Sequence, residues 1–201
     1  MKARAISKLD SLEAVLKKVK DKREKVLVLS KLADEYSAVK NPKSFDLLDE
    51  AESLAKKNNF SDELLMILNQ KGKMLIASSP EKSYEISMNV IERARKQKNK
   101  KEEAEALLNI GRFYVRKNIF DQAIDNFRKS LLIKESLGDI KGCGDLRHNI
   151  GYVYVKMGNN EEAINYFTQS LEDYKKINER KEEAGVLVQI GNIYFYKGDY
   201  F

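Results

Sequence analysis

Residues 109–115 read Asn-Ile-Gly-Arg-Phe-Tyr-Val, and the pattern returns at residues 149–155 as Asn-Ile-Gly-Tyr-Val-Tyr-Val. A third copy, Gln-Ile-Gly-Asn-Ile-Tyr, occupies residues 189–194. The glycines at the centre of the three copies are each forty residues apart. A fixed period of this length is the signature of a chain built from stacked structural repeats.

The rest of the repeating unit follows each glycine at constant offsets. An alanine, a phenylalanine and a serine follow Gly111 and Gly151 at the same distances: Ala123, Phe127 and Ser130, then Ala163, Phe167 and Ser170. Spacings of three, four and seven residues place side chains on one face of a helix. We therefore expect two helices per unit, with small residues where they approach closely and phenylalanines filling the space between successive hairpins.

Weaker copies precede these. Ala33 takes the place of the glycine in the first. The second is the segment at residues 68–74, the poorest copy, whose register stays open by one residue. Further upstream, apolar residues at helical spacing predict a helix that caps the stack. These residues are Ile6, Leu9, Leu12, Val15, Leu16 and Val19.

The repeating unit resembles the tetratricopeptide repeat, whose signature is a Leu-Gly pair followed by Tyr, Ala, Phe and Ala at these offsets. The resemblance implies an all-α fold, an α-solenoid of antiparallel helical hairpins wound into a right-handed superhelix without strands. It implies a capping helix at 1–21 and repeats at 22–201, divided at about 22–60, 61–100, 101–140, 141–180 and a partial 181–201. Helices are expected at 3–19, 22–39, 43–58, 61–77, 80–97, 101–117, 121–137, 141–157, 161–177 and 181–197.

Composition limits the function classes. The chain has 201 residues and a net charge of +6, but its charges form mixed runs, as in Lys100-Lys101-Glu102-Glu103. Mixed runs are typical of solvated helix faces and disfavour nucleic-acid binding. No run approaches the roughly 18 apolar residues of a membrane helix. The compartment stays open: cytoplasmic for the sequence as given, or periplasm-facing if signal and membrane segments were trimmed from a sensor.

No residue pattern predicts catalysis, a metal site or a cofactor. The single histidine, His148, and the single cysteine, Cys143, lie five residues apart and so on different sides of a helix. The stretch Gly142-Cys143-Gly144 follows no strand, and we interpret it as the turn between two hairpins. The chain is therefore expected to be a binding protein rather than an enzyme.

In the tetratricopeptide family, the first helix of each hairpin lines the concave face. Carried over by register, the lining positions are Glu105, Leu108, Arg112, Val115, Arg116, Asp145, His148, Tyr152, Val155, Lys156, Gly185, Val188, Asn192, Phe195 and Tyr196. We predict a partner-binding groove that contains Arg112, Arg116, His148, Tyr152, Lys156, Asn192, Phe195 and Tyr196. The alternative for each is ordinary exposed helix surface. As a set they favour a protein or peptide partner, and their basic and aromatic character favours an acidic peptide with an apolar anchor.

Three functions stay open. The forty-residue repeats resemble those of bacterial sensory proteins, which implies an interaction module in a larger signalling protein with a histidine kinase, cyclase or transcription-regulator output. The second is a free-standing cytoplasmic adaptor or scaffold. The third, a nucleic-acid-binding regulator, is disfavoured by the mixed charge runs.

The sequence ends in Gly198-Asp199-Tyr200-Phe201, which matches the turn before the second helix of a hairpin. The apolar residues Leu187, Ile190 and Tyr194 of the last predicted helix would then face no covering helix. We expect the C-terminal end either to self-associate weakly through this surface or to fray beyond about residue 180.

Overall fold

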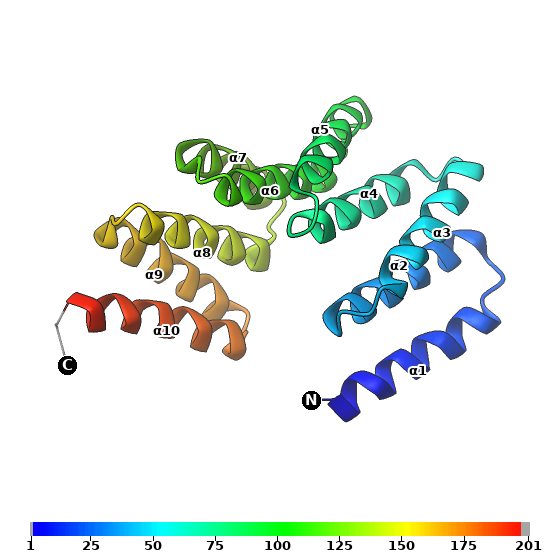
Figure 1. The fold of residues 1–201 in the computed structure, drawn as a ribbon, viewed down its shortest axis with the longest axis horizontal. Coiled ribbons are helices and arrows are strands. Elements are labelled where there is room, and N and C mark those ends of the chain that lie inside the picture. Colours follow the sequence, from blue (N-terminus) through cyan, green and yellow to red (C-terminus); the bar gives the residue numbers. More distant parts are fainter. Residues whose placement is uncertain (1, 198–201) are drawn as a thin grey trace. The chain divides into compact units, whose positions relative to one another are not determined.

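A computed structural model describes the backbone of residues 2–197 and the side chains of residues 8–196 (Figure 1). The side chain of Ile6 and the turn expected at residues 198–201 lie outside the described residues. Within that part of the chain, ten helices follow one another and no strand is present. Each helix boundary lies within two residues of the range expected from the sequence.

The helices are named in chain order. They are α1 (Lys2–Lys18), α2 (Lys22–Ala38), α3 (Lys43–Lys57), α4 (Ser61–Leu75), α5 (Pro80–Gln97), α6 (Lys100–Arg116), α7 (Phe120–Ser136), α8 (Ile140–Lys156), α9 (Asn160–Lys176) and α10 (Arg180–Lys197). None of these helices combines the length and apolar character that a crossing of a lipid bilayer requires.

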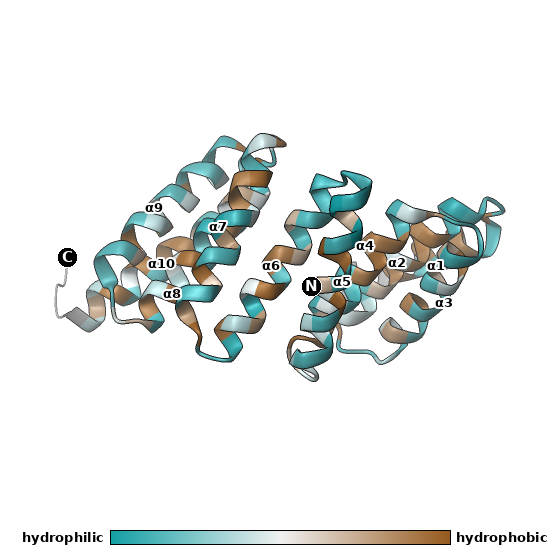
Figure 2. Cartoon of the chain, turned by 90° about the horizontal axis from the view of Figure 1, so that it is seen from above, coloured by the Kyte–Doolittle hydropathy of each residue, from teal (hydrophilic) through white to brown (hydrophobic). Residues whose placement is uncertain are grey.

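The chain divides into two compact units, Met1–Glu102 and Glu103–Phe201. The core of the first unit lies among α2, α3 and α4, and Leu16 of α1 packs against it. The core of the second unit is built around two buried rings, Phe127 of α7 and Phe167 of α9. Hydrophobic residues gather on the helix faces that pack together within each unit (Figure 2).

Seven of the nine turns between the described helices contain a residue in the left-handed region. In the second unit, Asn118 and Gly158 occupy equivalent positions, with φ of 58° and 77°. The amide of the next residue reaches back to the helix in both cases: Ile119 N–H donates to the Tyr114 carbonyl and Asn159 N–H to the Tyr154 carbonyl, each at 2.9 Å. Asparagine and glycine tolerate this conformation best, so either ends the helix at this point.

The second helix of every hairpin buries four side chains at one spacing of four, three and four residues. They are Ser44, Leu48, Ala51 and Ala55 in α3; Ser83, Ser87, Val90 and Ala94 in α5; Ala123, Phe127, Ser130 and Lys134 in α7; and Ala163, Phe167, Ser170 and Tyr174 in α9. Since Ser83 lies forty residues before Ala123, the forty-residue period extends back to α5. That period places Lys71 forty residues before Gly111, which fixes the register of the copy at residues 68–74.

The repeat glycines remove a clash with the ring opposite. A Cβ atom added to Gly111 would lie 2.3 Å from the Phe127 ring, and one added to Gly151 would lie 2.8 Å from the Phe167 ring. Real Cβ contacts do not come this close, so the two helices reach their observed separation only with glycine there. Gly191 differs, because a Cβ atom there would meet nothing within 4 Å.

The interpretation of Gly142-Cys143-Gly144 as a turn was wrong, because all three residues are buried in the first turns of α8. The physical reason is again space. A Cβ atom at Gly142 would lie 2.3 Å from the Asp139 carboxylate, and one at Gly144 would lie 2.9 Å from the Tyr174 ring. These glycines therefore allow close packing around the start of α8. The turn itself ends at Asp139, which caps α8 by accepting a hydrogen bond of 2.8 Å from the Gly142 N–H.

Candidate functional site

The eight predicted groove residues lie on α6, α8 and α10, the first helices of the hairpins in the second unit. They lie in three surroundings: an inner polar cluster around Arg112, an exposed rim around Lys156, and a pocket lined by Asn192 and Tyr196. Arg112 and His148 are half-buried, whereas Arg116, Tyr152, Lys156, Asn192, Phe195 and Tyr196 are exposed. Leu108, which the same register placed in the groove, is instead a core residue at 6% exposure.

Arg112 forms the basic part of the inner cluster. Burial lowers the pKa of its guanidinium, while the carboxylates of Glu105 and Asp145 act in the opposite direction. An arginine retains its charge under such conditions because its ordinary pKa lies far above neutrality. The inner cluster is therefore a partly compensated ionic group rather than a purely basic patch.

Asp145 connects this cluster to the neighbouring helix. Its Oδ1 accepts a hydrogen bond of 2.6 Å from the Tyr174 hydroxyl of α9. Burial, together with this bond, raises the pKa of Tyr174 well above its ordinary value. Glu105 and Asp145 occupy the position six residues before the repeat glycine, so they were among the lining positions predicted from the register. They were not among the residues predicted to bind the partner, which were chosen for basic and aromatic character.

Glu105 is held in the equivalent way one repeat earlier. The buried ammonium of Lys134 contacts Glu105 at 2.6 Å and Asp139 at 2.7 Å. Lys134 and Tyr174 are forty residues apart, so an ion pair in one repeat replaces a neutral hydrogen bond in the next. In both repeats, a residue of the second helix holds an acidic side chain of the groove, which limits how far that side chain can move toward a ligand.

His148 faces the core more than the groove. Its ring centroid lies 5.4 Å from that of Phe167. Burial lowers the pKa of His148, although Asp145 opposes the shift. The imidazole is accordingly neutral at neutral pH and contributes a hydrogen-bonding edge rather than a positive charge.

The exposed rim carries one accessible positive charge of α8, the ammonium of Lys156. The Lys156 ammonium lies 5.4 Å from the centroid of the Tyr152 ring, and both side chains are exposed. An ammonium over an aromatic face is held in place without losing its water-facing side. Lys156 can therefore still approach a carboxylate of a ligand.

A pocket of about 210 Å³ opens beside this rim, between α8 and α10. Three of the sequence-derived lining residues, Val155, Asn192 and Tyr196, contribute to its walls. Asn160, Gln189 and Ile193 complete the lining. Phe195 lies outside this set and makes an edge contact with Tyr196, with ring centroids 5.6 Å apart.

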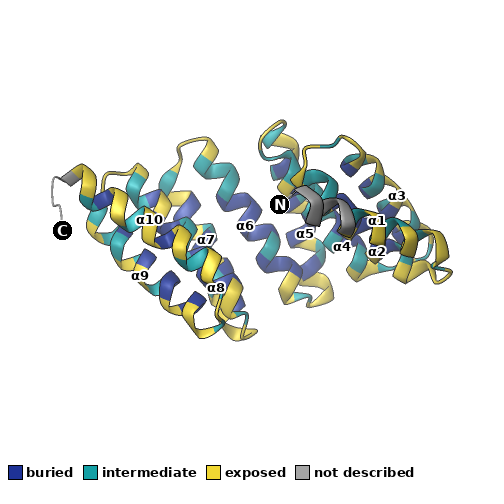
Figure 3. Cartoon of the chain, turned by 90° about the horizontal axis from the view of Figure 1, so that it is seen from below, coloured by how far each residue is buried: buried dark blue, intermediate teal, exposed yellow. Residues whose placement is uncertain are grey.

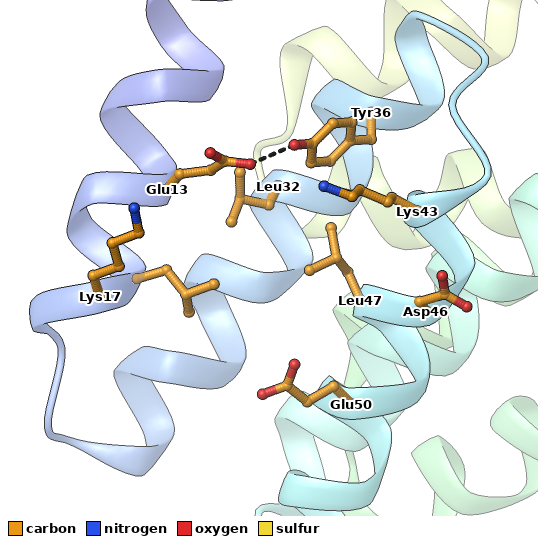
Figure 4. Close-up of a pocket in the computed structure, with 9 residues that line it drawn as sticks. Glu13, Lys17, Leu32, Tyr36, Lys43, Asp46, Leu47 and Glu50 are labelled. Atoms are coloured by element: carbon orange, nitrogen blue, oxygen red, sulfur yellow. Dashed lines mark hydrogen bonds between the residues drawn. The ribbon is translucent and has the colours of Figure 1, made fainter.

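A larger cavity in the first unit was not anticipated from the sequence. It has a volume of about 410 Å³ and lies among α1, α2 and α3 (Figure 4). Leucines from all three helices face it, and Glu13 at its edge accepts a hydrogen bond of 2.5 Å from the Tyr36 hydroxyl. Two basic and two acidic side chains also line it: Lys17, Lys43, Asp46 and Glu50. The helical spacing of Leu16, Leu32 and Leu47 indicated only core positions, so no sequence signal marked the cavity.

Reactive groups do not gather at either cavity. Among the residues that the structure describes, no three His, Cys, Asp or Glu side chains are placed to hold a metal ion. Cys143 is buried, and burial raises the pKa of its thiol to about 11. At neutral pH this thiol is protonated and therefore a poor nucleophile.

Comparison with known proteins identifies the repeat. A family model described as tetratricopeptide repeat matches residues 104–137 and 144–172. These two segments therefore carry tetratricopeptide repeats, and the all-α fold of helical hairpins is shared with a solved protein that contains such repeats. Among curated protein sequences, none matches the chain.

Solved structures share this fold at low sequence identity. The Rap conjugation gene regulator of plasmid pLS20, in complex with the Phr* peptide, aligns at a TM-score of 0.86 and 16% identity over 100% of this chain and 56% of that one. A signal transduction ATPase with a tetratricopeptide repeat sensor from Pyrococcus horikoshii aligns at 0.71 and 18%, over 96% and 32%. BtubC from P. vanneervenii aligns at 0.75 and 16%, over 98% and 83%. The chain thus spans about half of the first and a third of the second.

Proposed function

We propose that this chain is a non-catalytic interaction module, and that its second unit holds a protein or peptide along α6, α8 and α10. The observation that carries the proposal is the pocket between α8 and α10. Its volume of about 210 Å³ suits one apolar side chain, and Val155 and Ile193 supply apolar walls. Asn192 and Gln189 add amide groups that can bond to a peptide backbone. The peptide complex of the Rap regulator, a protein of the same fold, supports a peptide ligand.

The preferred ligand is an acidic peptide that carries an apolar anchor. The anchor would enter the pocket, and an adjacent carboxylate would meet Lys156, which follows Val155 directly in α8. Arg116, exposed at the end of α6, adds a second positive charge to the same face. Glu105 and Asp145 offset the charge of Arg112, so the rim rather than the inner cluster would select for acidic residues.

Fluorescence anisotropy with peptides selected on an array tests this proposal. Tyr196→Ala should weaken binding by removing a pocket wall, and Lys156→Glu should weaken binding and flatten its salt dependence. Lys129→Glu is the matched control, since Lys129 is an exposed lysine of α7 outside the groove, and it should leave binding unchanged. An array in which acidic peptides are no more frequent among the binders than neutral ones would remove the acidic preference.

We further propose that the module belongs to a larger bacterial signalling protein. The support is that the chain spans 56% of a regulator and 32% of a sensor ATPase that share its fold. An antibody raised against this chain, used on its source cells, should detect a protein well above 23.1 kDa. A native protein of that mass or close to it would instead favour a free-standing adaptor.

We also propose weak self-association through the C-terminal helix. The support is its exposed apolar surface, where Leu187, Val188 and Phe195 are more than half exposed. Large apolar side chains that gather on a surface usually mark a contact site. An average molar mass in solution that rises with protein concentration would indicate this association.

A further inference from the structure

Helix α10 presents an uncharged stripe to solvent. Residues 184–196 contain no Asp, Glu, Lys or Arg, the longest such stretch in the chain. Figure 3 shows that exposed and buried residues both occur along α10. By their helical spacing, the exposed members of the stretch fall on one side of the helix: Ala184, Gly185, Leu187, Val188, Gly191, Asn192, Phe195 and Tyr196. The opposite side is anchored, because Val186 and Ile193 are buried against α9.

The equivalent side of the preceding first helices is covered by another helix of this chain. Gly111 of α6 meets Phe127 of α7, and Gly151 of α8 meets Phe167 of α9. Gly191, at the same position of its repeat, meets nothing within 4 Å. By this internal comparison, the surface around Gly191 is shaped to receive a helix, and the occupant should carry side chains at the spacing of four, three and four found in α7 and α9.

Helix α10 itself carries that spacing on its exposed side. Ala184, Val188, Gly191 and Phe195 follow one another at steps of four, three and four residues. The stripe therefore has both properties at once: it offers a helix-binding surface and it resembles the helices that bind such surfaces. A second copy of the chain supplies the matching helix. We propose that two copies pair through α10, antiparallel and related by a two-fold axis, which deepens the self-association proposed above.

The order of residue sizes fixes the antiparallel direction. With the axis between residues 189 and 190, Ala184 faces Phe195 of the partner subunit and Val188 faces Gly191 of the partner subunit. Each of the four layers then combines one small and one larger side chain. A parallel pair would place Phe195 against Phe195 of the partner subunit and leave a void at the glycine layer. A two-fold interface requires this kind of self-complementary surface.

Electrostatics permit the pairing. The stripe buries no charge, so pairing carries no desolvation penalty for ions. The first turn of α10 carries Arg180 and Lys181 next to Glu182 and Glu183, so its charges balance, and the direction of the pair rests on the order of residue sizes.

Analytical ultracentrifugation of the 201-residue chain tests the pairing, over about 1 μM to about 1 mM, the range of weak contacts. We expect a reversible monomer–dimer equilibrium. Gly191→Arg should raise the dissociation constant at least about tenfold, because the charge enters the centre of the interface. The variant is expected to fold, since a Cβ atom added at this exposed position meets no atom within 4 Å. Leu132→Arg introduces the same charge at an exposed apolar residue of α7 and should leave the equilibrium unchanged.

Cross-linking tests the direction. Val188→Cys and Gly191→Cys are made in separate chains that carry tags of different mass, mixed and then oxidised. The antiparallel pair predicts that the mixed disulfide exceeds either homodimer. The native thiol of Cys143 is buried and protonated at neutral pH, so it should not compete. A dominant Val188→Cys homodimer would overturn the proposed arrangement in favour of a parallel one.

Failure of this inference can be separated from failure of peptide binding. A chain that stays monomeric up to 1 mM at about neutral pH while binding the acidic peptide would overturn the pairing and leave the groove intact. A synthetic peptide with the sequence of α9 provides a further arm, with Phe167→Ala in the peptide as its control. If that peptide binds at Gly191 while the chain stays monomeric, the surface accepts a separate helix and not a second copy.

Discussion

Gly151 and Gly191 occupy the same position of the repeat in opposite surroundings. A Cβ atom at Gly151 would crowd the Phe167 ring at 2.8 Å and the Ala163 carbonyl oxygen at 3.2 Å, whereas one at Gly191 would meet nothing. Neither position has a positive φ. The sequence pattern treats the two glycines alike, because it records the repeat position and not whether a helix lies opposite.

The two glycines should therefore respond to alanine with opposite signs. Gly151→Ala should destabilise the chain by about 1–3 kcal/mol, the usual cost of overpacking a core. Gly191→Ala should stabilise it by about 0.5–1 kcal/mol, because alanine is the better helix former and has room. Urea unfolding at a concentration where the chain is monomeric measures both. Equal effects at the two positions would mean that the surroundings of Gly191 are not open.

His148 gives the second unit a pH dependence. Burial lowers its pKa below the ordinary value of 6.5, so the folded state binds fewer protons than the unfolded state once the pH falls through that value. Its neutral form stabilises the fold fully above pH 6.5, and this contribution is lost as the pH falls below it.

We expect the free energy of unfolding of the His148→Gln variant to rise relative to that of the native chain as the pH falls. Comparing their unfolding free energies from about pH 7.5 to about pH 5.5 should show the difference moving steadily in favour of the variant. Asp145, which faces the imidazole, acts against the effect and limits its size. If the difference between the two unfolding free energies stayed constant over this range, the imidazole would already be charged or well solvated in the fold.

At the scale of the element, the helix ends depend on residues that tolerate a left-handed backbone. Most turns use asparagine or glycine, but Lys98 ends α5 with φ 55°. The next equivalent position holds Gly138, with φ 68°. A residue with a Cβ atom is strained in this region by about 1–2 kcal/mol.

Lys98→Gly should accordingly stabilise the first unit. Relief of the strain outweighs the greater freedom of glycine in the unfolded chain, so the net gain should be about 0.5–1 kcal/mol. The reverse change, Gly138→Lys, should cost a similar amount in the second unit. Thermal melts of both variants beside the native chain measure this, and a loss of stability in Lys98→Gly would show that the lysine side chain makes a contact worth more than the strain.

The sequence predicted elements well and side-chain surroundings less well. Helix ranges followed from the forty-residue period, because the period fixes both the buried residues and the turns. The same period could not tell that Leu108 is buried, or that acidic side chains surround Arg112. Those facts depend on which helix packs against a position, and repeats with equal spacing differ in that respect.

The predicted groove positions lie in different surroundings. Val155, Asn192 and Tyr196 line one pocket, although they hold different positions of the repeat. His148 turns to the Phe167 ring, because the glycine at position 151 brings that ring close to α8. The cavity among α1, α2 and α3 had no signal at all, since it arises from how three helices meet and not from any residue pattern.

On the scale of the whole molecule, stability should fall toward α10. Helix α7 packs into a core on the side of Phe127, whereas α10 is held only by the side that contains Val186 and Ile193. In repeat proteins, an element with one neighbour opens more easily than one with two.

Hydrogen exchange should show this gradient directly. In a dilute, monomeric sample, amides of residues 181–197 should exchange faster than those of residues 121–137. At high concentration, pairing through α10 should slow the exchange of residues 181–197 more than that of α7. Equal protection of the two helices in the monomer would mean that α10 does not need a covering helix.

The hydrogen bonds between helices also bear on how the chain acquires its fold. Ser130 donates to the Ala104 carbonyl across 26 residues, Tyr174 to Asp145 across 29, and Ser30 to Gln70 across 40. Each hairpin can form these bonds as soon as its own residues and those of its neighbour are available. Because chains with such local contacts close only short loops, they fold rapidly. Each repeat should therefore become structured during synthesis shortly after it leaves the ribosome, without waiting for the end of the chain.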